Sequence, residues 1–163
     1  MEIRRADGGD VEAIRRVAER SWDTDYPPFL TRETISDGIE EWYSHDSIRA
    51  DLANPRSSIF VAEHDGEVVG FVQTHRSDRT GHVLRLYVDP HHSRSGVGTA
   101  LYEAAVETMS AGDIDVVRAM ALAANERGCA FYRALGLDRV DTDTTTISGE
   151  RYEEAIFERA EDQ

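Results

Sequence analysis

The chain has 163 residues and is strongly acidic, with 32 aspartates and glutamates against 18 basic residues and a formal net charge of −14. A surface of this charge repels nucleic acid and anionic membranes, so neither is expected as a partner. No apolar run approaches the ~20 residues of a membrane helix and the N-terminus lacks a signal-peptide pattern, so we expect a cytoplasmic protein with one domain over residues 1–163.

All 18 basic residues are arginine. An acid excess without lysine is typical of halophilic proteins, whose charged surfaces stay soluble when salt shortens the Debye length to about 3 Å at 1 M. The alternative is an ordinary acidic protein from a G+C-rich genome, in which codon bias replaces lysine by arginine. Because codon bias does not account for the acidity, the halophilic interpretation is preferred. The single cysteine, Cys129, excludes an internal disulfide and a cysteine metal cluster.

Two helices are predicted in the first third of the chain, after a short strand at residues 3–5. Asp10 is placed as the N-cap of the first helix. Its inward-facing positions are Val11, Ile14, Val17, Ala18 and Ser21. Thr31 is placed as the cap of the second helix, whose apolar positions at i, i+4 and i+7 are Ile35, Ile39 and Trp42.

The rest of the chain alternates strands with two further helices. Strands are predicted at residues 59–62, 68–72, 82–88, 116–122, 140–147 and 151–157, and helices at about 98–109 and from Asn125 onward. Asp65-Gly66 and Ser148-Gly149 are placed in hairpin turns. Strands before and after two crossover helices predict a mixed α/β sheet.

The stretch from Leu84 to Leu101 contains the most informative pattern. Its strand should stop at Asp89, because Pro90 cannot donate a ladder hydrogen bond. Gly96 and Gly98 then open a helix, whose unpaired backbone N–H groups and positive dipole end can hold a pyrophosphate without an intervening Cβ. A P-loop is excluded because the chain has no lysine, and a dinucleotide fingerprint is excluded because position 101 is leucine.

Two segments resemble the Gcn5-related N-acetyltransferase (GNAT) superfamily. Residues 93–98, Ser-Arg-Ser-Gly-Val-Gly, resemble its Gln/Arg-x-x-Gly-x-Gly/Ala acetyl-CoA motif, with Ser93 departing from the usual Gln or Arg. Residues 125–137, Asn-Glu-Arg-Gly-Cys-Ala-Phe-Tyr-Arg-Ala-Leu-Gly-Leu, resemble the family's Asn-x-x-Ala-x-x-Phe-Tyr block. The resemblance covers most of the chain from residue 59 onward.

This resemblance implies a mixed, mostly antiparallel α/β sheet of about seven strands, flanked by helices and splayed next to Val88. It also implies transfer of an acetyl group from acetyl-CoA to a primary amine of a small molecule or protein, by direct attack in a ternary complex and without a metal. A homodimer stays open. The alternative is a non-catalytic acyl-CoA sensor or regulatory module; Tyr132 and Asn125 favour the enzyme.

The resemblance also assigns residues to the site. The acetyl-CoA site would comprise Leu86, Tyr87, Val88, Ser93, Arg94, Ser95, Gly96, Val97, Gly98, Thr99, Asn125 and Tyr132. A free backbone N–H near Val88, where Asp89-Pro90 interrupts the strand, would face the thioester carbonyl. The acceptor groove would be lined by Trp22, Tyr26 and Phe29, although core positions are the alternative for each.

The proton transfers are assigned to Tyr132 and His82. Tyr132 would protonate the leaving thiolate, and helical spacing predicts that it shares a cleft-facing stripe with Asn125 and Cys129 while Phe131 holds the helix on the sheet. By register, His82 occupies the position of a glutamate base found in many family members, and strand alternation places it on the face of Leu86 and Val88. An exposed strand-end histidine is the alternative for His82.

Three further sites are weighed. Glu63 and Glu33 remain open as the base, and the resemblance to the family also leaves base action through water open. The adjacent pair His91-His92 is interpreted as part of a turn, because no partner lies at metal-ligand spacing. Cys129 is interpreted as a packing residue, because no histidine or aspartate is recognisable that would activate its thiol.

Overall fold

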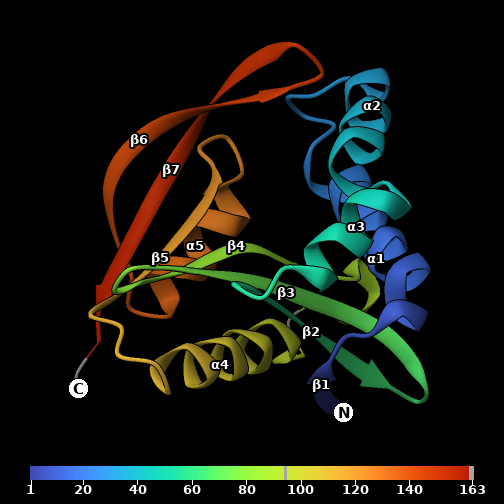
Figure 1. The fold of residues 1–163 in the computed structure, drawn as a ribbon. Helices are drawn as coiled ribbons and strands as arrows, with labels where there is room; N and C mark the ends of the chain where they lie inside the picture. Colours follow the sequence, from blue (N-terminus) through green and yellow to red (C-terminus); the bar gives the residue numbers. More distant parts are fainter. Residues whose placement is uncertain (94, 162–163) are drawn as a thin grey trace.

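The structure is a computed structural model that describes residues 1–93 and 95–161. Its centre is a seven-stranded sheet in the order β1-β2-β3-β4-β5-β7-β6 (Figure 1). The strands are β1 (Glu2–Arg5), β2 (Ser57–His64), β3 (Glu67–Ser77), β4 (Thr80–Val88), β5 (Val116–Leu122), β6 (Asp138–Ile147) and β7 (Glu150–Ala160). Only β4 and β5 run parallel, so the expectation of a mixed, mostly antiparallel sheet is confirmed.

Five α-helices cover the two faces of the sheet (Figure 1). They are α1 (Val11–Asp25), α2 (Arg32–Tyr43), α3 (His45–Ala53), α4 (Val97–Ser110) and α5 (Glu126–Ala134), with short 3-10 turns at Gly8–Asp10 and Pro90–His92. Helices α1–α3 bury their apolar residues in one core, and α4 and α5 bury theirs in another. No helix in the described ranges is long and apolar enough to cross a membrane.

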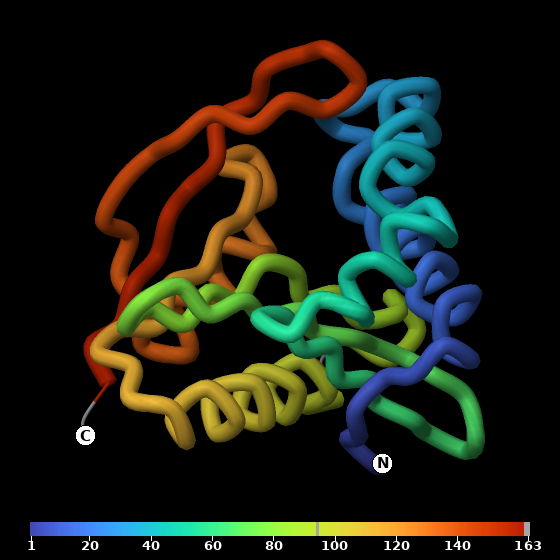
Figure 2. Tube along the Cα trace, viewed as in Figure 1, coloured from blue at the N-terminus to red at the C-terminus, as the bar shows by residue number. Residues whose placement is uncertain are grey.

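Both predicted hairpin turns have the backbone that their sequences require. Asp65 and Gly66 have φ of 52° and 80°, and Ser148 and Gly149 have φ of 50° and 80°. Positive φ at both central residues is the type I′ pattern, which matches the twist of antiparallel strands. The second turn reaches α2, where the Ser148 hydroxyl donates to Asp37 Oδ2 in the middle of that helix at 3.0 Å; Figure 2 shows the turn lying beside this helix.

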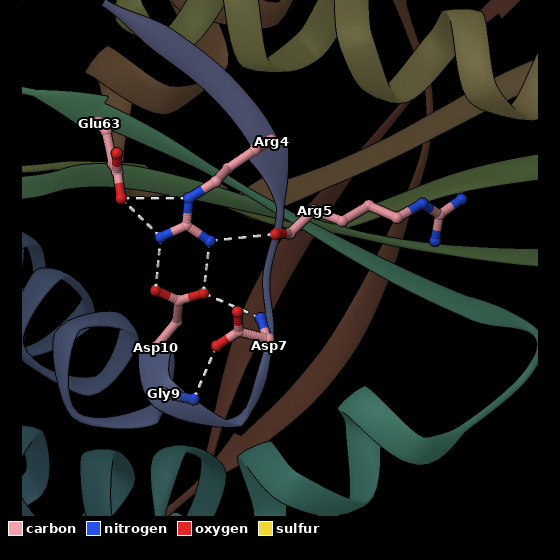
Figure 3. Close-up of polar contacts among 6 residues, drawn as sticks. All are labelled: Arg4, Arg5, Asp7, Gly9, Asp10 and Glu63. Atoms are coloured by element: carbon pink, nitrogen blue, oxygen red, sulfur yellow. Dashed lines mark hydrogen bonds and ion pairs between the residues drawn. The ribbon is translucent and has the colours of Figure 1, made fainter.

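The N-terminal helices differ from the prediction in two respects. Asp10 occupies the N-cap position of α1, as predicted, but its side chain makes no cap hydrogen bond to that helix. Its carboxylate instead accepts hydrogen bonds from the Arg4 guanidinium at 2.8 and 2.9 Å, and Arg4 also donates to Glu63 (Figure 3). Helix α3 was not predicted. It begins at a Ser44 cap directly after α2. The spacing of apolar residues that predicted the second helix does not continue past Trp42, so it gave no sign of a third helix.

The feature that shapes the centre of the molecule is a bulge in β4. Gln73 pairs with Arg85 but Thr74 pairs with Val83, so Leu84 has no partner in β3. Just there the ladder to β5 also ends, because β4 and β5 pair only from Thr80↔Val116 to Val83↔Ala119. Beyond Val83 the two strands diverge, which is the splay expected next to Val88.

Candidate active site

The diverging ends of β4 and β5 enclose a cavity of about 430 Å³, the central cleft. Its walls come from the end of α1, the splayed parts of β4 and β5, the start of α4, and α5. The lining residues are Ser21, Asp25, Tyr26, Leu84, Arg85, Leu86, Tyr87, Val88, Ser93, Gly96, Gly98, Thr99, Met120, Ala121, Asn125, Arg127, Gly128, Ala130, Phe131 and Tyr132. The cleft therefore brings together the two segments that the sequence singled out.

The start of α4 forms an anion cradle at one end of the cleft. Gly96 is the N-cap in the left-handed region, with φ of 85° and open space where a Cβ would lie. The first helical hydrogen bond runs from Ala100 N to Gly96 O at 3.0 Å, so it leaves the N–H groups of residues 97–99 without intrahelical partners. Gly98 has a different requirement, because a Cβ there would lie 3.1 Å from the Phe131 ring. Gly96 is therefore required by the backbone conformation, and Gly98 by the close packing of α4 on α5.

Backbone donors from β4 point into the splay. The Asp89 N–H is not available to a ligand, because it donates to Val69 O at 2.8 Å. In an antiparallel pair, alternate residues bond to the same neighbour. The N–H groups of Leu86 and Val88 therefore face away from β3, toward the gap that β5 has left. They are the donors available to a carbonyl oxygen in the cleft.

The α5 helix contributes Asn125 and Tyr132 from its buried side. Asn125 caps the helix, its Oδ1 accepting from Gly128 N at 3.1 Å. Tyr132 is only 4% exposed although it lines the cleft. Burial raises the pKa of its hydroxyl well above the usual value, so the group stays protonated. The expected stripes of α5 are reversed in part: Cys129 and Tyr132 pack into the core, and Phe131 is half-buried against the start of α4.

An ion pair that the sequence analysis missed crosses the cleft. Arg127 Nη1 of α5 lies 3.1 Å from Asp25 Oδ1 at the end of α1. Burial raises the pKa of Asp25 above its ordinary value, and the positive charge of Arg127 only partly opposes this. The sequence did contain a signal for this pair. A carboxylate in the last turn of a helix interacts unfavourably with the negative end of the helix dipole, so an aspartate at this position suggests a positively charged partner or a functional role.

His82 does not face the cleft as the strand alternation predicted. The bulge at Leu84 reverses the alternation of β4, so Val83 shares the α4 face with Leu86 and Val88, and His82 points to the opposite side. It does not line the cleft. Burial, followed by the nearby charges of Arg118 and His75, lowers its pKa. The alternative bases are no better placed, since Glu63 is engaged by Arg4 and Glu33 is exposed at the start of α2.

The three aromatic residues assigned to the acceptor groove have different surroundings. Trp22 is 0% exposed and belongs to the core, so in this structure its side chain cannot contact an acceptor directly. Tyr26 lines the central cleft. Phe29 is half-buried and packs on Tyr26, with ring centroids 5.3 Å apart, so it supports the wall rather than forming it.

The remaining expected residues surround the cradle. Ser93 lines the cleft and its hydroxyl donates to Pro90 O at 3.0 Å, while Ser95 donates to His92 O. Val97 is buried beneath the helix start. Arg94 lies outside the described residues. His91 and His92 belong to a 3-10 turn whose Asp89 cap is held by Arg20 of α1 at 2.8 Å, in keeping with their interpretation as turn residues.

Comparison with known proteins places this arrangement in a family. Residues 14–137 match the family model described as the acetyltransferase (GNAT) family. A spermidine N(1)-acetyltransferase from Thermoplasma acidophilum is 27% identical, over 94% of this chain and 98% of that protein. An uncharacterized N-acetyltransferase from Archaeoglobus fulgidus is 28% identical, over 87% of this chain and 96% of that one.

Solved structures agree with this assignment. The crystal structure of PaiA N-acetyltransferase from Thermoplasma acidophilum in complex with coenzyme A is similar, with a TM-score of 0.87, 26% identity, and 98% of each chain covered. A GCN5-related N-acetyltransferase from Rhodopseudomonas palustris has the same fold, with a TM-score of 0.84 at 18% identity and 98% and 94% of the two chains covered. The chain therefore belongs to the acetyltransferase (GNAT) family and is an acetyl-CoA-dependent N-acetyltransferase.

Proposed function

We propose that the acetyl acceptor is a small cationic molecule with more than one amine, of the polyamine class, and that transfer occurs by direct attack in a ternary complex. The observation that carries this proposal is the Asp25 carboxylate, which lines the central cleft and, within residues 1–93 and 95–161, has Arg127 as its one ion-pair partner. The similarity to a spermidine N(1)-acetyltransferase over 94% of the chain supports the same acceptor class.

Asp25 is suited to an ammonium ligand. Its side chain is 22% exposed, so a cation reaching it from solvent is attracted at a lower effective dielectric than on an open surface. Arg127 is 57% exposed and makes one contact of 3.1 Å, so it is an exchangeable partner. One ammonium of a polyamine would replace Arg127 at Asp25 and leave a second amine free to reach the thioester. The net charge of −14 would also draw cationic acceptors toward the protein.

The reaction can be written on the groups that line the cleft. The acceptor nitrogen attacks the thioester carbon, and the N–H groups of Leu86 and Val88 stabilise the oxyanion that develops. The C–S bond then breaks as the new C–N bond is completed. Tyr132 gives its proton to the departing thiolate, which suits a hydroxyl that burial keeps protonated. The acceptor amine is neutral when it attacks and loses one proton to solvent once the C–N bond has formed. The Tyr132 phenolate takes one proton back from solvent, so the transfers balance over the cycle.

The setting of the enzyme is also part of the proposal. We infer a cytoplasmic, halophilic enzyme, because the acid excess without lysine suits a salt-rich interior.

The test is release of free thiol from acetyl-CoA with three acceptors: spermidine, butylamine and a peptide with a free N-terminus. Spermidine should have the highest kcat/KM. Asp25→Asn should raise the KM for spermidine about tenfold, equivalent to ~1.4 kcal/mol of binding free energy, and leave the KM for acetyl-CoA unchanged.

Asp23→Asn is the matched control, because Asp23 lies in the same helix but is exposed and does not line the cleft. It should leave the KM for spermidine at the wild-type value. Equal kcat/KM for spermidine and butylamine, or equal KM values for the two variants, would contradict the polyamine assignment. Absence of thiol release with every amine would contradict the catalytic role itself.

A further inference from the structure

A second cavity lies at the far end of α4 from the central cleft. It has a volume of about 580 Å³, and we call it the arginine recess. Its lining residues are Arg5, Pro55, Arg56, Ser58, Thr74, Arg76, Asp78, Thr108 and Met109. Among the described residues, it shares no lining residue with the central cleft. Helix α4, which begins at the cleft with Val97, contributes Thr108 and Met109 to the recess from its last turn.

The first arginine of the recess is Arg5 in β1, and the alternation of side chains along that strand directs it there. Arg4 and Arg5 are adjacent in β1, so their side chains leave opposite faces of the sheet. Arg4 is neutralised by Asp10 and Glu63, whereas the Arg5 side chain extends away from that cluster (Figure 3). Arg5 lies over the Phe60 ring at 5.3 Å from its centroid and contacts Ser58 Oγ at 3.5 Å. Its guanidinium is thus held in place without a carboxylate.

The other two arginines come from neighbouring strands. Arg76 N donates to Arg56 O at 3.1 Å, which fixes the backbone of Arg56, just before β2, beside the end of β3. The Arg76 side chain lies close over Gly112, where even a Cβ would meet its Nη1 at 1.8 Å. Within the described ranges, neither arginine has an ion-pair partner within 4.0 Å.

The charge of the recess is opposite to that of the molecule. Three guanidinium groups face one carboxylate, that of Asp78, in a chain with 32 acidic and 18 basic residues. Like charges gathered on neighbouring strands oppose folding, and a chain so rich in acid could have paired them. Arginine also presents a planar fork of donors that matches phosphate oxygens. The buried Thr74 and the half-buried Ser58 and Thr108 add hydroxyl groups to the lining.

From this arrangement we infer that the arginine recess binds a small anion carrying two or more linked phosphate groups, separately from acetyl-CoA. A polyphosphate chain can engage the three guanidinium groups together, which a single monovalent anion cannot do. The recess opens on the face of β1, β2 and β3 that α4 packs against, at the end that α4 leaves uncovered. Its ligand would therefore not compete with the acetyl-CoA cradle at the opposite end of the helix.

The test is calorimetric titration with inorganic tripolyphosphate, with ATP as a second arm that presents the same chemistry from a nucleotide. The Gly96→Glu variant serves as the background, because a carboxylate in the cradle excludes phosphate from the central cleft. Salt is held at the lowest concentration at which circular dichroism shows the native fold. One equivalent of tripolyphosphate should bind, and adding Arg56→Glu should weaken it at least tenfold.

Arg151→Glu on the same background is the matched control, because Arg151 is also exposed but lies at the start of β7, outside the recess. It should leave the affinity for tripolyphosphate within about twofold. Absence of binding to the Gly96→Glu protein, or equal affinities for the two charge-reversed variants, would overturn the inference. Neither readout depends on an acceptor or on turnover, so the result is separate from the test of the polyamine assignment.

Discussion

Tyr132 combines a packing position in the core with the proposed role of proton donor. Its ring lies in the core next to Phe157, with centroids 5.8 Å apart, while the residue also lines the central cleft. Burial raises the pKa of its hydroxyl, so the hydroxyl is protonated and available as a donor. Because a thiol is the stronger acid, with a reference pKa of about 8.5, the transfer to the thiolate is uphill and has to be coupled to return of a proton from solvent to Tyr132. The packed ring also fixes where the hydroxyl points, so positioning and protonation have the same physical cause.

Tyr132→Phe tests this role by removing one oxygen and keeping the ring. The kcat should fall by about 10²–10⁴, the usual range for general acid catalysis. The affinity for CoA should change little, because the phosphate cradle belongs to α4. Steady-state kinetics with spermidine and calorimetry with CoA would measure both. Near-full turnover would reduce Tyr132 to a packing residue.

His82→Ala is the comparison for that experiment. Because the bulge at Leu84 turns His82 away from the central cleft, its removal should leave the acidic limb of the pH–rate profile where it is in the wild type. A shift of that limb would restore His82 as the base.

At the scale of the elements, the cleft depends on contact between α4 and α5. A Cβ on Gly98 would lie 3.1 Å from the Phe131 ring, so α4, which carries the proposed phosphate cradle, and α5, which carries Tyr132, meet at a glycine. A larger residue at this position must push the two helices apart.

Gly98→Val tests this contact. Overpacking should cost about 1–3 kcal/mol of stability, and displacement of the cradle should weaken CoA binding at least tenfold. Thermal melting and calorimetry measure the two effects. Gly8→Val is the matched control, since a Cβ at Gly8 meets nothing within 4 Å, and it should change neither. Native affinity for CoA in Gly98→Val would show that the cradle does not require this close approach.

Local patterns predicted most of these elements, because local physics decides them. Asp65-Gly66 forms the expected turn since its two residues accept positive φ, and β5 begins and ends at the predicted residues, Val116 and Leu122. The cradle glycines were likewise readable, because a helix start depends on adjacent residues. The family resemblance supplied the expectation of a splay near Val88.

The predictions that failed concern register and long-range contact. No local signal marks Leu84 as the unpaired residue of a bulge; that is set by how β3 and β5 pair on either side of it, and the face of His82 depends on it. The pairing of Asp25 with Arg127 joins positions far apart in sequence. Trp22 was open to either interpretation because burial of an aromatic residue depends on what packs over it, here the rings of Trp42 and Tyr43.

At the scale of the whole molecule, the net charge of −14 decides how the protein responds to salt. Many of the ion pairs, such as that of Arg79 with Asp115, lie at the surface and contribute little to stability. The excess of acidic residues therefore acts mainly through mutual repulsion, which opposes the compact state until it is screened.

Stability should consequently rise from low salt to molar sodium chloride, where the Debye length is about 3 Å. The melting temperature, followed by circular dichroism, measures this. Sodium chloride is the right salt because sulfate strengthens apolar burial in any protein, and an acidic protein rich in lysine provides a reference. A melting temperature that stays flat or falls would contradict the halophilic interpretation.

The short ladder between β4 and β5 has a mechanical consequence. Strands β1–β4 and strands β5–β7 are two half-sheets, joined along the sheet by a seam of only four paired positions, Thr80–Val83 with Val116–Ala119. Everything beyond that seam is spanned by side chains or by whatever occupies the gap. A ligand seated in the gap would contact both half-sheets at once, so its binding should restrict their relative motion and its release should restore that motion.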